Sequence, residues 1–250
     1  MNAEQRVTEL TALLSRVVAR HPPVGFASSF GAEDMVLTDL IARQSLPIAI
    51  FTLDTGRLPG ETYELIDRVR AHYGLPLDVH CPDAPVLETY IRVHGVNGFY
   101  RSRELREGCC AIRKAAPLAR ALAGCGAWIT GQRRAQSVTR RDLAIEEFDA
   151  LHNMPKFNPL ADWTEAEVWQ YLDANDVPTN PLHARGYPSI GCAPCTRAIE
   201  PGEDIRAGRW WWEDPQYREC GLHRGSSAGV VPVAAAGGAG GRLAAHGRQE

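Results

Sequence analysis

Short apolar runs alternate with amphipathic segments through residues 1–150 of this 250-residue chain, and no other feature constrains its fold more. The runs PPVGFA, LPIAIFTL, LPLDVH and AWIT predict strands, and LAIEEFD predicts a further one. Helical periodicity is found between and before them, at 1–20, 35–44, 60–73, 84–94 and 109–123, and Gly74 is expected to close the helix at 60–73. Strands and helices that alternate at this spacing form a parallel sheet covered on both faces, with ligands at the carboxyl ends of the strands. The predicted fold class is therefore α/β with a Rossmann-like parallel sheet.

The composition is that of an ordinary soluble globular protein. The chain is 44% hydrophobic and 23% charged with a formal net charge of −3. It can therefore bury a core, and it has no basic field for long nucleic acid. Residues 1–20 contain no apolar run long enough for a signal peptide or a membrane span. We expect a cytoplasmic protein with no membrane or nucleic-acid partner, and small anions are the ligands left to consider.

The chain changes character at Asn158, after which prolines are frequent. Thr164 and Glu167 form a predicted capping box at the start of a helix. We interpret residues 1–157 as the α/β core with its N-terminal helix and residues 158–225 as an accessory lid segment. The Ala- and Gly-rich tail at 226–250 has too little bulk to bury and is expected to be disordered.

Two motifs of small residues follow predicted strands at one rim of the sheet. In SSFGAEDMV, Ser28 to Val36, small side chains let backbone N–H groups approach an anion, and the next helix adds a partial positive charge. In LDTGRLPGET, Asp54 and Thr55 are candidates for contact with a ribose or base, and Leu53 for the wall of the pocket. Each motif alone also fits a capped turn without a ligand. The pair favours a ligand site, because the switch point of a parallel sheet is built from two such turns.

A cluster of arginines follows the strand AWIT and comprises Arg133, Arg134, Arg140 and Arg141. One interpretation is a solvated run of charge. The other is recognition of phosphate or sulfate, because the arginines continue from a strand end into the same rim.

Four of the seven cysteines form two pairs in the sequence, Cys109 with Cys110 and Cys192 with Cys195. Adjacent helical residues diverge by about 100°, which suits a single tetrahedral zinc poorly. An iron–sulfur cluster has several iron atoms, so two diverging thiolates can each bind a different one. Buried free thiols are the alternative, which explains one pair better than two. Cys81 and Cys125 have no such partner and are interpreted as core thiols.

Cys220 lies in YRECGLHRG, just before the Ala- and Gly-rich tail. Arg218, His223 and Arg224 surround it with positive charge. Positive charge favours the thiolate, which is the nucleophilic form of cysteine. The alternative is an exposed cysteine without a role.

Together these motifs resemble the assimilatory adenylyl-sulfate (APS) reductases, relatives of the PAPS reductases. The resemblance covers Pro23 to Gly225 and depends on SSFGAEDMV, LDTG, GQRR, the two cysteine pairs and ECGLH. It implies a fold of the adenine nucleotide alpha-hydrolase type with a C-terminal cluster-binding and lid segment. It also implies one 4Fe-4S cluster, and thioredoxin as a separate reductant. PAPS reductases lack the cluster cysteines, so the presence of all four indicates APS as substrate.

The resemblance also assigns site residues. The cysteines that look like cluster ligands are Cys109, Cys110, Cys192 and Cys195. The positions that match the nucleotide pocket are Ser28, Ser29, Leu53, Asp54, Thr55 and Gly131. Lys114 is expected near both cluster and substrate. The positions that match the phosphosulfate site are Arg140, Arg206, Arg209 and His223, with Arg141 as the alternative register for Arg140.

The implied reaction starts with attack of the Cys220 thiolate on the sulfonyl sulfur of APS. AMP leaves, and thioredoxin then releases sulfite from the S-sulfocysteine. No electron needs to pass through the cluster. The alternatives are a PAPS reductase, a tRNA-thiolating enzyme of the same fold, and a non-enzymatic zinc-binding module. The oligomeric state stays open, with a homo-oligomer among the options.

Overall fold

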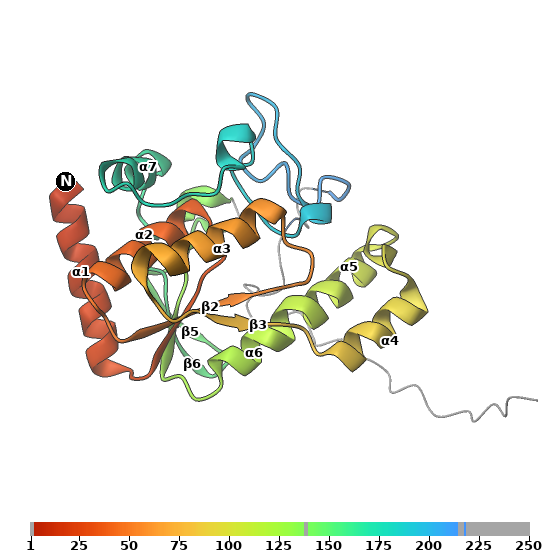
Figure 1. Ribbon diagram of the computed structural model, residues 1–250, viewed down its shortest axis with the longest axis horizontal. Helices are drawn as coiled ribbons and strands as arrows, with labels where there is room; N and C mark the ends of the chain where they lie inside the picture. Colours follow the sequence, from red (N-terminus) through yellow and green to blue (C-terminus); the bar gives the residue numbers. More distant parts are fainter. Residues whose placement is uncertain (1–2, 138–139, 215–217, 219–250) are drawn as a thin grey trace, which may run out of the picture.

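The computed structural model describes residues 3–137, 140–214 and 218, and within them one sheet has the strand order β3-β2-β1-β4-β6-β5 (Figure 1). The strands are β1 (Val24–Ala27), β2 (Ile48–Leu53), β3 (Asp78–His80), β4 (Ala127–Ile129), β5 (Glu146–Asp149) and β6 (Met154–Phe157). Neighbouring strands are parallel except for β5 and β6, which are antiparallel. The predicted α/β class with a mainly parallel sheet is confirmed.

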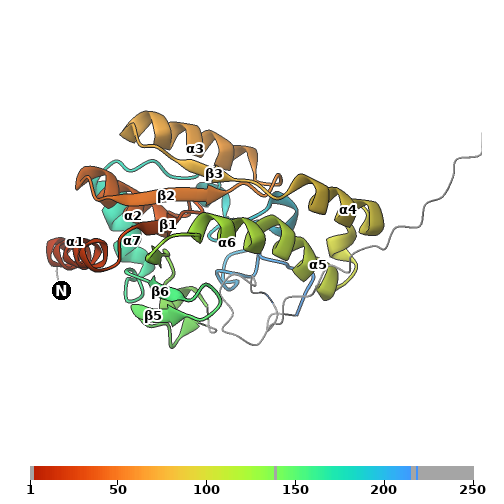
Figure 2. The ribbon, with the colours of Figure 1, turned by 90° about the horizontal axis from the view of Figure 1, so that it is seen from below.

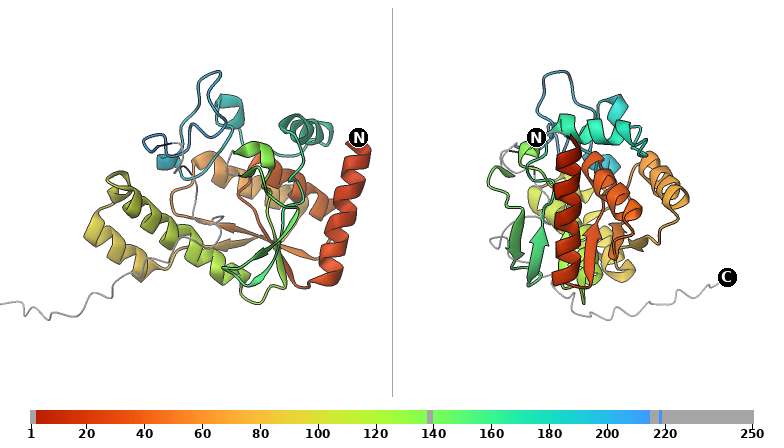
Figure 3. Two further views of the ribbon diagram at one scale, coloured as in Figure 1. Left: turned by 180° about the vertical axis from the view of Figure 1, so that it is seen from behind. Right: turned by 90° about the vertical axis from the view of Figure 1, so that its left-hand side faces the viewer.

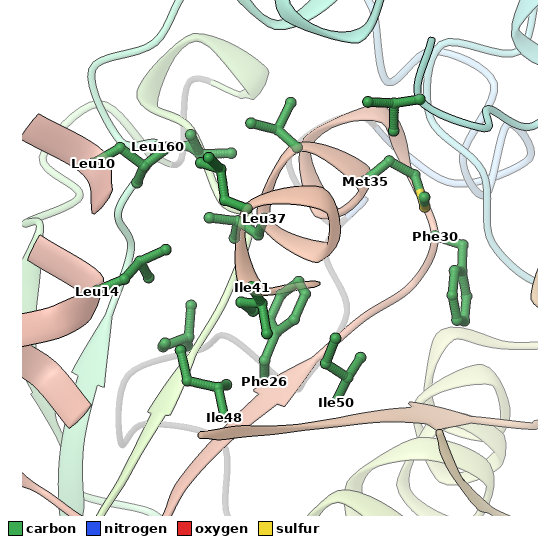
Figure 4. Close-up of a cluster of buried hydrophobic side chains, with 14 of the residues drawn as sticks. Leu10, Leu14, Phe26, Phe30, Met35, Leu37, Ile41, Ile48, Ile50 and Leu160 are labelled. Atoms are coloured by element: carbon green, nitrogen blue, oxygen red, sulfur yellow. The ribbon is translucent and has the colours of Figure 1, made fainter. Parts of the chain in front are cut away.

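Helices cover both faces of the sheet (Figures 2 and 3). One face is covered by α1 (Ala3–Arg20), α2 (Ala32–Arg43), α3 (Gly60–Tyr73) and α7 (Glu165–Ala174). The buried side chains between these helices and the sheet include Leu14, Phe26, Met35, Leu37, Ile41 and Ile50 (Figure 4). The other face is covered by α6 (Ala116–Leu122), whose Leu118 and Leu122 pack against Phe51 and Trp128. Alternate residues of β1, β2 and β4 thus enter two separate cores.

The helix expected at 109–123 is longer and composite. It starts as α5 (Arg103–Cys110), where the side chain of Ser102 accepts the N–H of Leu105. It then passes through a π-helical turn, η2 (Ala111–Ala115), into α6. The segment RSRELREG has no apolar periodicity, so the first turns of α5 could not be recognised by that criterion. The helix α4 (Ala84–His94) matches its expected range.

The predicted signals for the end of α3 and the start of α7 are present in the structure. Gly74 ends α3 in the left-handed region with φ of 63°. Thr164 and Glu167 form the capping box of α7, with Thr164 N–H to Glu167 Oε2 at 2.7 Å and Glu167 N–H to Thr164 Oγ1 at 3.2 Å. The strand expected in LAIEEFD is β5, whereas β6 was not predicted, because MPKF shows neither alternation nor an apolar run.

The chain order of the sheet reverses at β1, which lies between β2 and β4. Such a switch point leaves a crevice at the carboxyl ends of the strands. The motif SSFGAEDMV directly follows β1, LDTG starts at the last residue of β2, and GQRR starts two residues after β4, so all three lie at this crevice. In the part of the chain that the structure describes, no helix combines the length and the apolar character that crossing a membrane requires.

Candidate active site

A cavity of about 220 Å³ lies at the switch point, between the loops after β1, β2 and β4 and the segment 183–210. Many of the predicted site residues line it, from widely separated parts of the sequence: Ser28, Ser29, Leu53, Thr55, Lys114, Gly131, Arg140, Arg206 and Arg209. In Figure 1 the segment that closes the cavity, coloured cyan to blue, is at the top of the molecule. The fold therefore brings the nucleotide and phosphosulfate candidates to one place.

Asp54 does not line the cavity, and two other predicted residues are not described by the structure. The Asp54 carboxylate is directed into its own turn, where Oδ1 accepts the Gly56 N–H and the Tyr63 hydroxyl, both at 2.7 Å. Asp54 thus holds the shape of the loop that presents Leu53 and Thr55. Cys220 and His223 lie outside the described residues, as does the tail at 226–250.

A buried carboxylate that the sequence interpretation missed joins two of the rim loops. Asp34 Oδ2 accepts the backbone N–H of Ser29 at 2.6 Å and the Ser29 hydroxyl at 2.7 Å, and the N–H of Gly131 also donates to this carboxylate. A Cβ on Gly131 would lie 2.1 Å from Asp34 Oδ1, so the close approach requires glycine. Burial raises the pKa of Asp34 to about 6 against the opposing effect of the Ser29 hydrogen bonds. In the sequence, Asp34 is only one of two acidic residues in the first turn of a helix, a position that gives no sign of this role.

The arginine cluster after β4 separates into structural and cavity-lining members. Arg133 is buried and pairs with Glu33 at 2.6 Å, and Arg134 pairs with Asp162. Arg140 lines the cavity, whereas Arg141 is exposed. The structure therefore places Arg140, and not Arg141, at the cavity.

Four basic side chains line the cavity: Lys114, Arg140, Arg206 and Arg209. The guanidinium of Arg209 is 6% exposed and lies 4.7 Å from the centre of the Trp210 ring. It also lies so close to Gly191 that a Cβ there would be 2.2 Å from Nη2. A wall with this charge suits a ligand with several anionic oxygens.

The two cysteine pairs come together beside this cavity. Cys109, Cys110, Cys192 and Cys195 line a second cavity of about 20 Å³, together with Arg57, Arg106, Arg113 and Lys114. Lys114 lines both cavities. Phe99, Trp210 and Trp212 pack against the cysteines and shield them. The predicted convergence of the two pairs is thus present.

Thr55 connects the two cavities. Its Oγ1 lies 3.3 Å from Cys192 Sγ, and its carbonyl oxygen accepts a hydrogen bond from Arg113. One residue beyond Cys192 and two beyond Thr55, the N–H of Ala193 donates to the carbonyl of Arg57 at 2.8 Å. The turn that lines the nucleotide cavity is therefore bonded directly to the Cys-X-X-Cys segment.

The chemistry of the cysteine group fits a polynuclear cluster. Within the described ranges, no group of three or more His, Cys, Asp and Glu side chains is arranged to hold a metal ion. Four thiols faced by basic side chains suit a bound group of net negative charge. Arg113 Nε and Trp210 Nε1 are buried beside the cysteines without a hydrogen-bond partner among the described residues, and each offers an N–H to sulfur. The side chains present thus fit an iron–sulfur cluster.

As a free thiol, Cys195 would be neutral. Burial raises the pKa of Cys195 to about 12, the neighbouring Cys192 raises it further, and Arg209 and Lys114 oppose the shift. A thiol bound to metal is deprotonated outright. A site of buried free thiols would therefore differ from a metal site in the charge on sulfur as well as in the presence of the metal.

His183 is a further cavity residue that sequence reasoning missed. Its Nδ1 lies 3.0 Å from the carbonyl of Tyr187, and Nε2 is buried without a partner among the described residues. Burial lowers the pKa of His183, so the neutral ring presents Nε2 as an acceptor. It lies in a stretch without a motif, and nothing in the sequence indicated it.

Comparison with known proteins agrees with this site. Residues 23–198 match the model of the phosphoadenosine phosphosulfate reductase domain. The adenosine 5'-phosphosulfate reductase of Burkholderia cepacia is 60% identical over 87% of each chain. That of Allochromatium vinosum is 56% identical over 89% of this chain and 87% of the relative.

Solved structures show the same fold. The phosphoadenylyl-sulfate (PAPS) reductase from Candida auris, a phosphate complex, is 26% identical with a TM-score of 0.66, covering 79% of this chain and 96% of that chain. The FMN adenylyltransferase of Candida glabrata, at 16% identity and a TM-score of 0.52 over 84% of this chain and 72% of that chain, shares the fold alone. With the fold, the cavity and the matched residues taken together, the chain belongs to the phosphoadenosine phosphosulfate reductase family, which includes the adenosine 5'-phosphosulfate reductases.

Proposed function

We propose that this protein reduces APS to sulfite and AMP in sulfate assimilation, with thioredoxin as the reductant. The observation that carries the proposal is a cation-lined cavity bonded through Thr55 to a group of four cysteines. The names of the bacterial relatives support APS as the substrate. The cytoplasm is the compartment in which thioredoxin keeps thiols reduced, and we place the reaction there.

The cavity offers separate surroundings for the two halves of APS. Ser28, Leu53 and Gly131 form its wall at the strand ends and suit the adenosine half. The basic side chains suit the phosphosulfate and are in place before the reaction begins: Lys114, Arg140, Arg206 and Arg209. Fixed positive charge stabilises the negative charge that moves onto the leaving phosphate.

Cys220 is the proposed nucleophile on the strength of its sequence surroundings. Its thiolate attacks the sulfonyl sulfur of APS, and the bond from that sulfur to the bridging oxygen breaks with its electron pair going to AMP. A thioredoxin thiolate then attacks the sulfur of Cys220, and the bond to the SO3 group breaks to release sulfite. The second thioredoxin cysteine resolves the mixed disulfide. His223 completes the proposed phosphosulfate contacts.

Cys109, Cys110, Cys192 and Cys195 would hold one 4Fe-4S cluster. When bound, the cluster would supply a fixed negative field beside the substrate, and no electron needs to pass through it. Lys114 lies between cysteines and substrate, where its charge acts on both. Arg113, whose guanidinium donates to the Thr55 carbonyl, holds the LDTG turn against the cysteines.

Sulfite release by the anaerobically purified protein with thioredoxin tests the proposal. APS should support turnover with a kcat/KM well above that of PAPS. Preference for PAPS would replace the substrate assignment with that of a PAPS reductase. Failure with both nucleotides, together with sulfur transfer to tRNA, would replace the reaction class.

A further inference from the structure

One buried glutamine at the substrate cavity has an unused hydrogen-bond donor. Gln132 follows β4, is 5% exposed and lines the cavity. Its Nε2 is buried without a hydrogen-bond partner in the part of the chain that the structure describes. A buried donor left unpaired is costly, so a partner that arrives with the ligand is the simplest explanation.

The orientation of the Gln132 carboxamide is fixed by a lysine. Lys156 Nζ donates to Gln132 Oε1 at 2.9 Å. An ammonium group has no acceptor, so the carboxamide must present its oxygen to Lys156. The NH2 group therefore faces the other way, which settles the assignment of the two ends of the amide.

Lys156 is itself held from two sides. It is 7% exposed, its Nζ lies 2.8 Å from Glu147 Oε1, and it lies 5.5 Å from the centre of the Trp128 ring. These contacts come from β5 and β4, which flank the strand β6 that carries Lys156. The lysine thus has little freedom to release Gln132.

A second path of hydrogen bonds fixes the backbone of Gln132. Thr130 Oγ1 donates to Asn158 Oδ1 at 2.6 Å and accepts the N–H of Gln132 at 3.3 Å. Asn158 Nδ2 donates to Glu147 Oε1 and to the carbonyl of Ala144, both at 2.9 Å. Thr130 and Asn158 are 3% and 0% exposed. A buried network whose hydrogen bonds are satisfied is rigid, and this one positions Gln132 Nε2, the donor left without a partner among the described residues.

The surroundings decide which ligand group this donor meets. The same loop carries Arg140, whose Nη1 is hydrogen-bonded to Gln136 Oε1, and Lys114 lines the cavity from the π-helical turn. The acidic residues of the cavity wall are engaged, Glu33 by Arg133 and Asp34 by Ser29. A neutral donor among basic side chains is suited to an anionic oxygen.

We propose that Gln132 is a substrate-binding residue whose side-chain N–H donates to an oxygen of the nucleotide 5'-phosphate. This inference rests on the proposed function, because it takes an adenosine phosphate as the ligand of the cavity. The Gln132 contact is neutral and directional, and it adds to the contacts of the basic side chains. Lys156 holds Gln132 in position for it.

Calorimetric titration of the full-length protein, purified without oxygen, with AMP and with adenosine tests the inference. Gln132→Met removes the donor at similar volume, and Gln132→Glu keeps the contact with Lys156 but turns a carboxylate oxygen toward the phosphate. We expect AMP to bind about 10- to 100-fold more weakly to Gln132→Met, the loss typical of a hydrogen bond to a charged group, and more weakly still to Gln132→Glu. Adenosine should bind all three proteins equally. Gln170→Met, at an exposed glutamine of α7, is the matched control and should leave AMP binding unchanged.

The other outcomes overturn the inference in distinguishable ways. Equal losses of affinity for AMP and for adenosine would show that the donor contacts the nucleoside and not the phosphate. Unchanged AMP affinity in both variants, with or without a lower melting temperature, would make Gln132 purely structural. Wild-type protein that binds no AMP would overturn the proposed function and this inference together, whereas tight binding by wild type and variants alike overturns the inference alone. If Gln132→Met does not fold, Gln132→Glu decides, because it keeps the partner of Lys156.

Discussion

Thr55 Oγ1 lies 3.3 Å from Cys192 Sγ, so one hydroxyl group separates the substrate cavity from the cysteine pairs. The same oxygen accepts the N–H of Arg57 at 3.2 Å, and in the thiol form it also accepts the S–H of Cys192. When Cys192 is a thiolate, this hydroxyl donates to it. Charge on the sulfur is thereby coupled to the position of the turn that lines the cavity.

Thr55→Val should expose this coupling, because valine has the shape of threonine without the hydroxyl. The sulfur loses a donor to a charged acceptor, which is worth about 1.5–3 kcal/mol. We expect sulfite release to fall about tenfold or more, and the visible absorption of the iron–sulfur protein to bleach faster in air. Thr55→Ser keeps the hydroxyl and should behave as wild type. Equal behaviour of the valine and serine variants would show that the hydroxyl has no role.

Replacement of Cys192 or Cys195 by serine should remove the cluster and most of the activity, since a hard hydroxyl oxygen is a poor ligand for iron in place of a thiolate. Iron and sulfide analysis of protein purified without oxygen measures the loss. Cys81→Ser is the matched control, because Cys81 is exposed, contrary to its interpretation as a core thiol, and does not line the cysteine cavity. A colourless wild-type protein with stoichiometric zinc would contradict the assignment.

Asp34 should make stability depend on pH in an unusual direction. Its pKa is about 6 in the folded protein against an ordinary value of 3.8, so between these values the folded state binds more protons than the unfolded state. Stability then falls as the pH rises from about 4 to about 6, by up to about 3 kcal/mol, and levels off above. Asp34→Asn does not titrate. Subtracting its unfolding free energy in urea from that of wild type at each pH should isolate this fall, and a difference independent of pH would contradict it.

Gly191→Ala should displace Arg209 without unfolding the protein. The new Cβ would lie 2.2 Å from Arg209 Nη2, the far end of a long side chain, so the guanidinium must shift away from its place over Trp210. We expect the KM for APS to rise about tenfold through loss of a charged contact. Gly60→Ala is the control, because a Cβ there meets nothing within 4 Å. A normal KM in Gly191→Ala would show that the position of Arg209 does not matter for binding.

Local sequence signals predicted the fold where the structure depends on local rules. Gly74 and the Thr164 capping box end and begin helices by contacts within a few residues. The strand β6 depends instead on its neighbours, since MPKF becomes a strand by pairing with β4 and β5. Tertiary pairing of this kind leaves no signature in a short segment.

For the site, the sequence indicated the residues that motifs carry and missed those that distant contacts create. Thr55 and Arg140 belong to recognisable turns or charge clusters and line the cavity as expected. Asp34 becomes part of the site only because Gly131, distant in sequence, approaches it within the reach of a backbone N–H. Gln132 becomes a positioned donor only through Lys156, which lies on the unpredicted strand β6.

The structure describes Arg218, two residues before Cys220, and hydrogen bonds tie Arg218 to the cavity wall. Arg218 Nε donates to the carbonyl of Glu213 at 2.9 Å, and its Nη1 and Nη2 donate to the carbonyls of Ala207 and Trp211 at 3.3 and 3.2 Å. Arg206, which lines the cavity, donates to the carbonyl of Arg218 at 3.2 Å. The residue two positions before Cys220 is therefore anchored beside the phosphosulfate candidates.

Cys220→Ser should accordingly keep the iron content and bind AMP as wild type does, yet release no sulfite, because the serine hydroxyl is a far weaker nucleophile than a thiolate at neutral pH. Wild-type protein mixed with APS in the absence of thioredoxin should gain the mass of one SO3 group on the peptide that contains Cys220, and addition of reduced thioredoxin should remove it as sulfite. Peptide mass spectrometry locates the adduct, and Cys81→Ser serves as the control that still forms it. An adduct on Cys81 or Cys125, or sulfite release by Cys220→Ser at the wild-type rate, would contradict the role assigned to Cys220.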